Sequence, residues 1–164
     1  MTYSTIAPIT PQATVGVVAN TLTAIRQLTT DDQLGLLWTL YKNMGRAITP
    51  AAPGAARLQF AEGLLEQVKA MPHTLQLQFM RNLIENKNTP ETRAYGVLTN
   101  NTKLAFWYRL AVLMDEGTVV PVPDYYKLSD AGMQLFGTIS RLDFGQQITV
   151  MRQMVVAMGV DPLA

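Results

Sequence analysis

The sequence contains no cysteine and only one histidine. The absence of cysteine excludes disulfides, thiolate metal sites and cysteine nucleophiles. The single histidine, His73, follows a proline at an expected helix start, where it is typical of a surface or capping position. The HExxH, P-loop, GxGxxG, GxSxG and EF-hand patterns are also absent. We therefore expect no metal site and no enzymatic activity, and a binding role is favoured.

Charge is scarce as well. Only 15% of the residues are charged, against about a quarter in typical soluble domains. The formal net charge is +1, so the chain lacks the strong positive electrostatic potential that would indicate nucleic-acid binding. The N-terminus has no signal-peptide pattern, and no apolar run reaches the length of about 18 residues that a membrane span needs. We expect a soluble cytoplasmic protein with apolar surface to spare for a ligand or a partner.

Apolar residues recur at helical spacing along most of the chain. They predict helices over residues 14–28, 30–44, 55–70, 74–85, 90–96, 101–117, 129–139 and 143–159, and no strand. Residues 1–14 are predicted to form an N-terminal arm, and residues 15–164 one helical domain. Prolines break the pattern at TPAAPG, residues 49–54, and at TVVPVPDYY, residues 118–126. The second break is expected to be an extended apolar connection that packs across the body.

Three predicted helices begin with recognisable capping signals. The run from Thr30 to Gln33 has a capping-box pattern with two acidic residues in the first turn. Thr89 followed by a proline predicts a capped helix start. Asp143 and Gln146 repeat the acid-x-x-Gln signal. These signals set the expected helix starts.

The helix over residues 101–117 is apolar nearly all round, which predicts a buried helix packed on several sides. It carries Trp107 and Tyr108, the largest adjacent aromatic surface in the chain. Trp38 and Tyr41 form a second aromatic set. Methionines at 80, 114 and 151 lie on helices that can face the same centre. Two interpretations follow from these residues: an ordinary helical core, or a long apolar slot between helices.

Four blocks carry a resemblance to a known family: DDQLGLLWTLYKNMG, ITPAAPGAARLQFAEG, NNTKLAFWYRLAVLMDEGTVVPVPDYYKLS and GQQITVMRQMVVAMG. They resemble successive parts of the N-terminal domain of the cyanobacterial orange carotenoid protein, in the same order and with the same spacing from about residue 15 to 160. The sequence ends where that two-domain protein continues into a C-terminal domain. The chain is thus most similar to the stand-alone helical carotenoid proteins.

The resemblance implies an all-α fold of two four-helix bundles with a keto-carotenoid, canthaxanthin or echinenone, threaded between them. Val112 stands where the family commonly has an acidic residue facing the carotenoid, and Arg81 where it usually has a cysteine. The positions that match the family's carotenoid contacts are Leu34, Leu37, Trp38, Tyr41, Met80, Leu104, Trp107, Tyr108, Met114, Val122, Tyr126, Ile148, Thr149 and Met151.

The resemblance also implies partners. Arg152 matches the arginine that the family uses toward its C-terminal domain and, once freed, toward the phycobilisome. Asn101 matches another position of the same interface. We expect a monomeric photoprotective protein that quenches singlet oxygen. The alternatives are direct quenching of phycobilisome excitation at the thylakoid surface, and carriage of carotenoid received from a separate C-terminal-domain homologue. Outside the family, the alternative is a helical protein-interaction adaptor.

Overall fold

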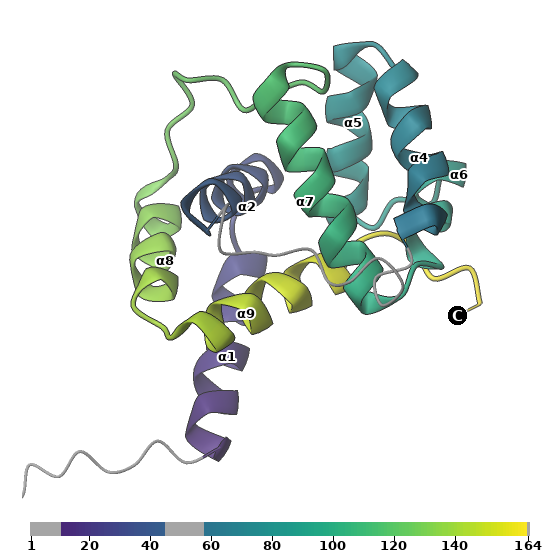
Figure 1. The fold of residues 1–164 in the computed structure, drawn as a ribbon. Helices are drawn as coiled ribbons and strands as arrows, with labels where there is room; N and C mark the ends of the chain where they lie inside the picture. Colours follow the sequence, from purple (N-terminus) through teal and green to yellow (C-terminus); the bar gives the residue numbers. More distant parts are fainter. Residues whose placement is uncertain (1–10, 45–57, 164) are drawn as a thin grey trace, which may run out of the picture.

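A computed structural model describes residues 11–44 and 58–163 of the protein. These residues form eight helices and no strand, which confirms the predicted all-α class (Figure 1). The helices are α1 (Pro11–Arg26), α2 (Thr30–Met44), α4 (Leu58–Ala70), α5 (His73–Ile84), α6 (Pro90–Gly96), α7 (Asn100–Glu116), α8 (Asp130–Ser140) and α9 (Phe144–Val156).

The helices pack as two bundles. In the first, α1 contacts α8 and α9, and α8 contacts α2 and α9; in the second, α4 contacts α6 and α7, and α5 contacts α6. Three pairs of helices pack across the boundary between the bundles: α7 packs on α9 and on α2, and α2 packs on α5 (Figure 1). The buried apolar residues form one cluster that runs through both bundles.

Helix α7 is the central element that the sequence predicted. Phe106 and Leu110 are fully buried. The Phe106 ring meets the rings of Phe79, Tyr95 and Trp107 edge-on, with centroids 5.5 to 6.5 Å apart. Edge-to-face contacts at this spacing are favourable for aromatic rings. The helix ends at Glu116 and is capped by Gly117, whose φ of 82° is a left-handed conformation that suits glycine.

Most of the predicted helix starts are confirmed. Capping boxes form at Thr89 and at Asp143, and Ser129 caps α8. The start of α2 is a correction, because the cap is Thr29 rather than Thr30. The Thr29 hydroxyl oxygen accepts from the Asp32 N–H at 3.2 Å. The capping residue is therefore one position earlier in the chain than the sequence pattern predicted.

Two helix ends also differ from expectation. Helix α1 begins at Pro11, inside the predicted arm, because proline at the first helical position is already in a helical φ. Helix α9 ends at Val156, three residues early, because the Gly159 N–H donates to the Leu83 carbonyl of α5 at 2.8 Å instead of continuing the helix. The rest of the arm and the break at residues 49–54 lie outside the described residues.

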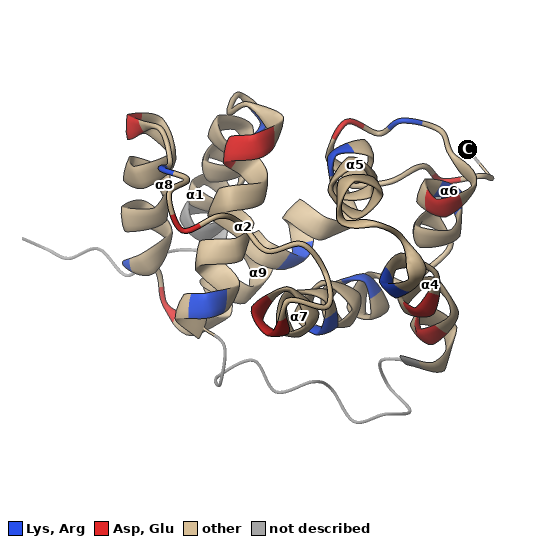
Figure 2. Ribbon diagram, turned by 90° about the horizontal axis from the view of Figure 1, so that it is seen from above, with Lys and Arg blue, Asp and Glu red and all other residues tan. Residues whose placement is uncertain are grey.

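Charged residues are scattered over both bundles. Figure 2 shows acidic and basic positions interleaved along the helices, in keeping with the small net charge. Among the described residues, none of the helices combines the length and the apolar composition needed to cross a bilayer.

Candidate functional site

An apolar cavity of about 290 Å³ lies where the two bundles meet. Helix α2 supplies one wall, α5 and α7 supply the opposite wall, and the connection between α7 and α8 covers it. The lining residues are Asp31, Leu34, Leu37, Trp38, Tyr41, Leu77, Met80, Arg81, Trp107, Ala111, Met114, Val120, Pro121, Val122, Pro123, Tyr125 and Tyr126.

Tyr41 presents its ring to the cavity while its hydroxyl is used elsewhere. The hydroxyl donates to the Leu104 carbonyl of α7 at 2.9 Å. The side chain is buried, and burial raises the pKa of Tyr41 well above its ordinary value. The phenol therefore stays neutral and adds an apolar face to the wall.

Trp107 behaves in the same way on the opposite wall. Its indole N–H donates to the Tyr95 hydroxyl at 3.2 Å, and that hydroxyl donates in turn to the Val155 carbonyl of α9. Trp107 and Tyr95 are both buried. The polar atoms of the two principal aromatic walls are thus satisfied inside the protein, so the rings present hydrocarbon-like surface to the cavity.

The connection over the cavity is fixed near both of its ends. Near its start, the Val120 N–H donates to Oε1 of Gln76 at 2.8 Å, and Nε2 of Gln76 donates to the Val68 and Thr118 carbonyls. Gln76 is fully buried on α5. Gln76 therefore supplies hydrogen-bond partners to backbone groups that would have them from a neighbouring strand in a sheet. It also binds the connection to the second bundle.

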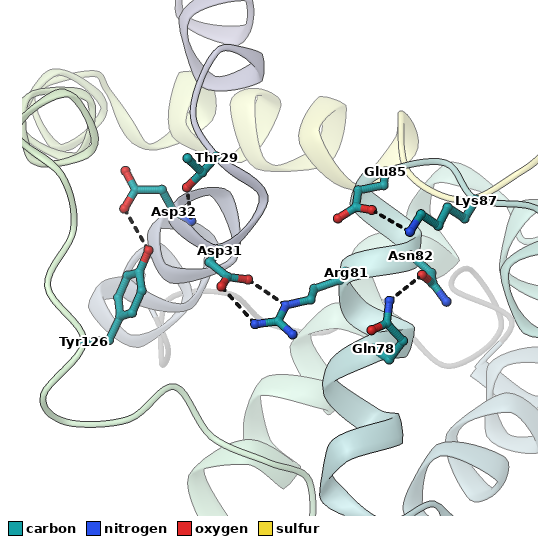
Figure 3. A network of polar contacts seen from close by, with 9 residues as sticks. All are labelled: Thr29, Asp31, Asp32, Gln78, Arg81, Asn82, Glu85, Lys87 and Tyr126. Carbon is teal, nitrogen blue, oxygen red and sulfur yellow. Dashed lines mark hydrogen bonds and ion pairs between the residues drawn. The ribbon is translucent and has the colours of Figure 1, made fainter.

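Near the other end, Asp32 of α2 holds the connection. Its carboxylate accepts from the Tyr126 hydroxyl at 3.0 Å (Figure 3). It also accepts from the Ser129 N–H at 3.0 Å and from the Ser129 hydroxyl. Asp32 is 3% exposed. Burial, together with the carboxylate, raises the pKa of Tyr126 to about 12, so this phenol is a neutral donor.

A bidentate ion pair links the two walls directly. Nε and Nη2 of Arg81 on α5 donate to the two carboxylate oxygens of Asp31 on α2, at 2.8 and 2.9 Å (Figure 3). The hydrogen bonds that Arg81 donates to Asp31 lower the pKa of Asp31 and raise the pKa of Arg81. Both side chains line the cavity and are partly exposed.

A second hollow of about 300 Å³ adjoins the first. The two share Tyr41 and Ala111 as wall residues. Lys42 stands at this hollow, 3.7 Å from the Asp115 carboxylate and 5.1 Å from the centre of the Trp38 ring. Tyr41 and Ala111 therefore form a shared wall between two hollows that lie along α2 and α7.

Ten of the fourteen predicted pigment contacts line these two hollows. Nine line the first cavity: Leu34, Leu37, Trp38, Tyr41, Met80, Trp107, Met114, Val122 and Tyr126. Tyr108 lines the second. Their contact with a pigment remains a prediction.

The other four lie elsewhere in the fold. Leu104 and Ile148 are partly buried against the core, and Met151 is fully buried on α9. Thr149 donates to the Gly145 carbonyl and lines a separate hollow beside α1.

The two predicted partner residues lie on different helices. Asn101 is exposed at the start of α7. Arg152 is partly buried on α9, and its Nε atom is buried with no hydrogen bond to any described residue. A buried donor without an acceptor is unusual in a folded protein. The roles of both residues remain predictions.

The residues that sequence reasoning missed are those that hold the walls in place. Gln76 and Tyr95 carry no local signal, because their partners lie far away in the chain. Asp31 and Asp32 were interpreted only as first-turn residues. The proximity of two acidic side chains to Arg81 and Tyr126 becomes visible only in the folded chain.

Comparison with known proteins identifies the family to which this fold belongs. The family model described as the N-terminal domain of the orange carotenoid protein matches residues 11–161. An orange carotenoid-binding domain-containing protein of Nostoc sp. is 60% identical over 147 residues, which are 90% of this chain and 86% of that protein. The orange carotenoid-binding protein of Limnospira maxima is 46% identical over 145 residues, 88% of this chain. This chain spans 46% of that protein's length.

Solved structures agree. A red carotenoid protein of Anabaena (Nostoc) sp. that binds canthaxanthin superposes with a TM-score of 0.77 at 41% identity, over 88% of this chain and 99% of that one. The orange carotenoid protein of the same organism, also binding canthaxanthin, gives a TM-score of 0.83 at 40% identity, over 94% of this chain and 53% of that one. The chain therefore belongs to the orange carotenoid protein N-terminal domain family.

Proposed function

We propose that this chain is a carotenoid-binding photoprotective protein, not an enzyme, that holds a keto-carotenoid between its bundles and quenches singlet oxygen. The observation that carries the proposal is an apolar cavity whose aromatic walls, Tyr41 and Trp107, have their polar atoms satisfied inside the protein. Such walls suit a long hydrocarbon, because they offer apolar contact and leave no buried donor unpaired. The related structures that contain canthaxanthin support the same pigment class, canthaxanthin or echinenone.

The chain's own residues would serve as a holder. A bound carotenoid supplies a low-lying triplet state that accepts energy from singlet oxygen. The protein buries the apolar polyene, which alone aggregates in water, and its ring walls contact the pigment at low entropic cost. The Gln76 and Asp32 hydrogen bonds keep the connection over the cavity.

The size of the cavity sets an expectation about binding. At about 290 Å³ it is near the lower end of ligand sites, about 300 to 1,000 Å³. A carotenoid is about as long as a helix of twenty residues, roughly 30 Å. We expect the pigment to use both hollows, so that the wall made by Tyr41 and Ala111 opens as it binds. We place the loaded protein in the cytoplasm as a monomer.

Expression in a canthaxanthin-producing bacterium tests the proposal. We expect a coloured, monodisperse protein. Trp38→Ala should lower the pigment-to-protein ratio, because the partly buried indole lines the cavity. Phe144→Ala is the matched control, because Phe144 is 51% exposed at the start of α9 and should leave the ratio unchanged. A soluble, folded and colourless wild-type protein would contradict the proposal and favour the adaptor alternative.

A second candidate function is direct quenching of phycobilisome excitation, and the unpartnered Nε of Arg152 favours it. Because Nε itself is buried, we expect an acidic group on a partner to pair with the other guanidinium nitrogens of Arg152. Coloured protein mixed with phycobilisomes should then lower their fluorescence, and Arg152→Glu should abolish this effect while the colour persists. Unchanged fluorescence with the wild-type protein would leave only the singlet-oxygen role. Transfer of pigment from a separate C-terminal-domain homologue, followed by absorption, tests the carrier alternative.

A further inference from the structure

One pair of charged side chains interrupts the apolar wall of the cavity. Among the described residues that line it, Asp31 and Arg81 are the only charged side chains, and the rest are aliphatic, aromatic, methionine or proline. They sit on opposite walls, on α2 and α5, and meet through two hydrogen bonds. This position stands out chemically, because the remaining wall has little to offer a polar group of a ligand.

The ion pair leaves part of the guanidinium available. Arginine has five N–H donors, and two of them serve Asp31. The remaining three include both hydrogens of Nη1, the nitrogen that points away from Asp31 in Figure 3. Nη1 makes no hydrogen bond to the described part of the chain. Asp31 therefore fixes the plane of the guanidinium without exhausting its donors.

We propose that Arg81, oriented by Asp31, donates a hydrogen bond to the ring carbonyl oxygen of the bound pigment and thereby selects keto-carotenoids over hydrocarbon carotenoids. This inference rests on the proposed function, since it requires a carotenoid in the cavity. A carbonyl oxygen can only accept and a guanidinium can only donate, so the two are complementary. The Asp31 carboxylate can only accept and would repel the same carbonyl.

The competing donors in the wall are fewer than its composition suggests. The hydroxyls of Tyr41 and Tyr126 and the indole N–H of Trp107 already donate within the protein. The indole N–H of Trp38 and the hydroxyl of Tyr125 are left. Tyr125 is 84% exposed, so water competes for its hydroxyl. A charged donor also gives a shorter and stronger hydrogen bond than a neutral one, which favours Arg81.

The contact would leave a spectroscopic mark. A hydrogen bond to a carbonyl that is conjugated with the polyene draws electron density toward oxygen. This lowers the C=O stretching frequency and shifts the main absorption to longer wavelength. A hydrocarbon carotenoid has no carbonyl, so the same arginine should leave its spectrum unaffected. A purely structural Arg81 would alter neither signal in this pigment-dependent way.

The experiment compares two pigments and two substitutions at one residue. Pigment-free wild-type, Arg81→Met and Arg81→Lys proteins are titrated with canthaxanthin and with β-carotene. We expect Arg81→Met to lower the preference for canthaxanthin roughly fivefold to tenfold, and to raise the C=O frequency in the resonance Raman spectrum. Arg81→Lys keeps a charged donor and should restore part of both effects, and the affinity for β-carotene should change much less than the affinity for canthaxanthin.

The outcomes separate this inference from the proposed function. A wild-type protein that binds neither pigment defeats the proposed function and this inference with it. Binding of both pigments with the same preference and C=O frequency in all three proteins defeats only the role of Arg81. Loss of preference in Tyr125→Phe or Trp38→Phe, but not in Arg81→Met, assigns the carbonyl to another donor and also overturns the inference. Circular dichroism confirms that each variant is folded.

Discussion

Removal of the Asp32 carboxylate should destabilise the whole domain, although the residue is not part of the apolar core. In the Asp32→Asn variant, one acceptor oxygen becomes an NH₂ donor. Three groups donate to this carboxylate, namely the Tyr126 hydroxyl and the N–H and hydroxyl of Ser129. The Ser129 N–H can only donate, and a hydroxyl that turns to accept from the new NH₂ group loses its own acceptor in a buried site. The Ser129 hydroxyl also accepts from the Gly132 N–H, so the start of α8 is disturbed as well.

The magnitude follows from these contacts. A hydrogen bond to a charged group contributes about 1.5 to 3 kcal/mol, and the contacts of one carboxylate are not additive. We expect a loss of about 3 kcal/mol in the free energy of unfolding for Asp32→Asn. In a chain of this size each kcal/mol shifts the melting temperature by about 2 to 4 °C, so the melting temperature should fall by roughly 6 to 12 °C.

Thermal unfolding followed by circular dichroism at 222 nm gives the measurement. Asp124→Asn is the matched control, because Asp124 is exposed on the same connection and its substitution should change stability by less than about 0.5 kcal/mol. A double-mutant cycle with Tyr126→Phe should show coupling, because the two side chains share a hydrogen bond. Equal melting temperatures for Asp32→Asn and Asp124→Asn would refute the reasoning.

Three further predictions concern the core. Tyr95→Phe leaves the Trp107 N–H without its acceptor and should cost about 1 to 3 kcal/mol of unfolding free energy, with a changed near-ultraviolet circular dichroism spectrum. Gly96→Ala should unfold at much lower urea than wild type, because its Cβ would lie 1.8 Å from the Val160 carbonyl oxygen, whereas Gly63→Ala meets nothing within 4 Å and should stabilise by about 0.5 to 1 kcal/mol. Burial lowers the pKa of Lys103 below its ordinary 10.5, so the unfolded chain binds more protons and the urea midpoint should rise as the pH climbs through the lowered pKa. Lys103→Met should flatten that rise, and an unchanged slope would count against a buried ammonium.

Local patterns were sufficient for the helices and for most of their caps. Thr89, Ser129 and Asp143 could be predicted as caps because each bonds a backbone N–H three residues further along. The start of α2 was missed by one residue, since Thr29 and Thr30 are equally good capping residues by type. Apolar spacing located the central helix for the same local reason.

The organisation of the cavity could not be predicted from patterns of this kind. Gln76 meets the Val120 N–H across 44 residues, and the Tyr126 hydroxyl meets Asp32 across 94. Each such contact joins two segments whose relative placement depends on the packing of both bundles. Arg81 could be recognised only as a departure from the family residue. Its partner Asp31 became visible when α2 and α5 were brought together.

The first turn of α2 carries two neighbouring residues that hold different parts of the cavity wall. Asp31 pairs with Arg81 on the opposite wall, and Asp32 binds Tyr126 of the connection between α7 and α8. Local unfolding of the first turn of α2 would therefore break both contacts at once. A rod-shaped pigment would then enter the cavity most easily at this end of the helix. Substitutions that speed or slow pigment exchange should accordingly concentrate at this one end of α2 rather than spread evenly along the passage.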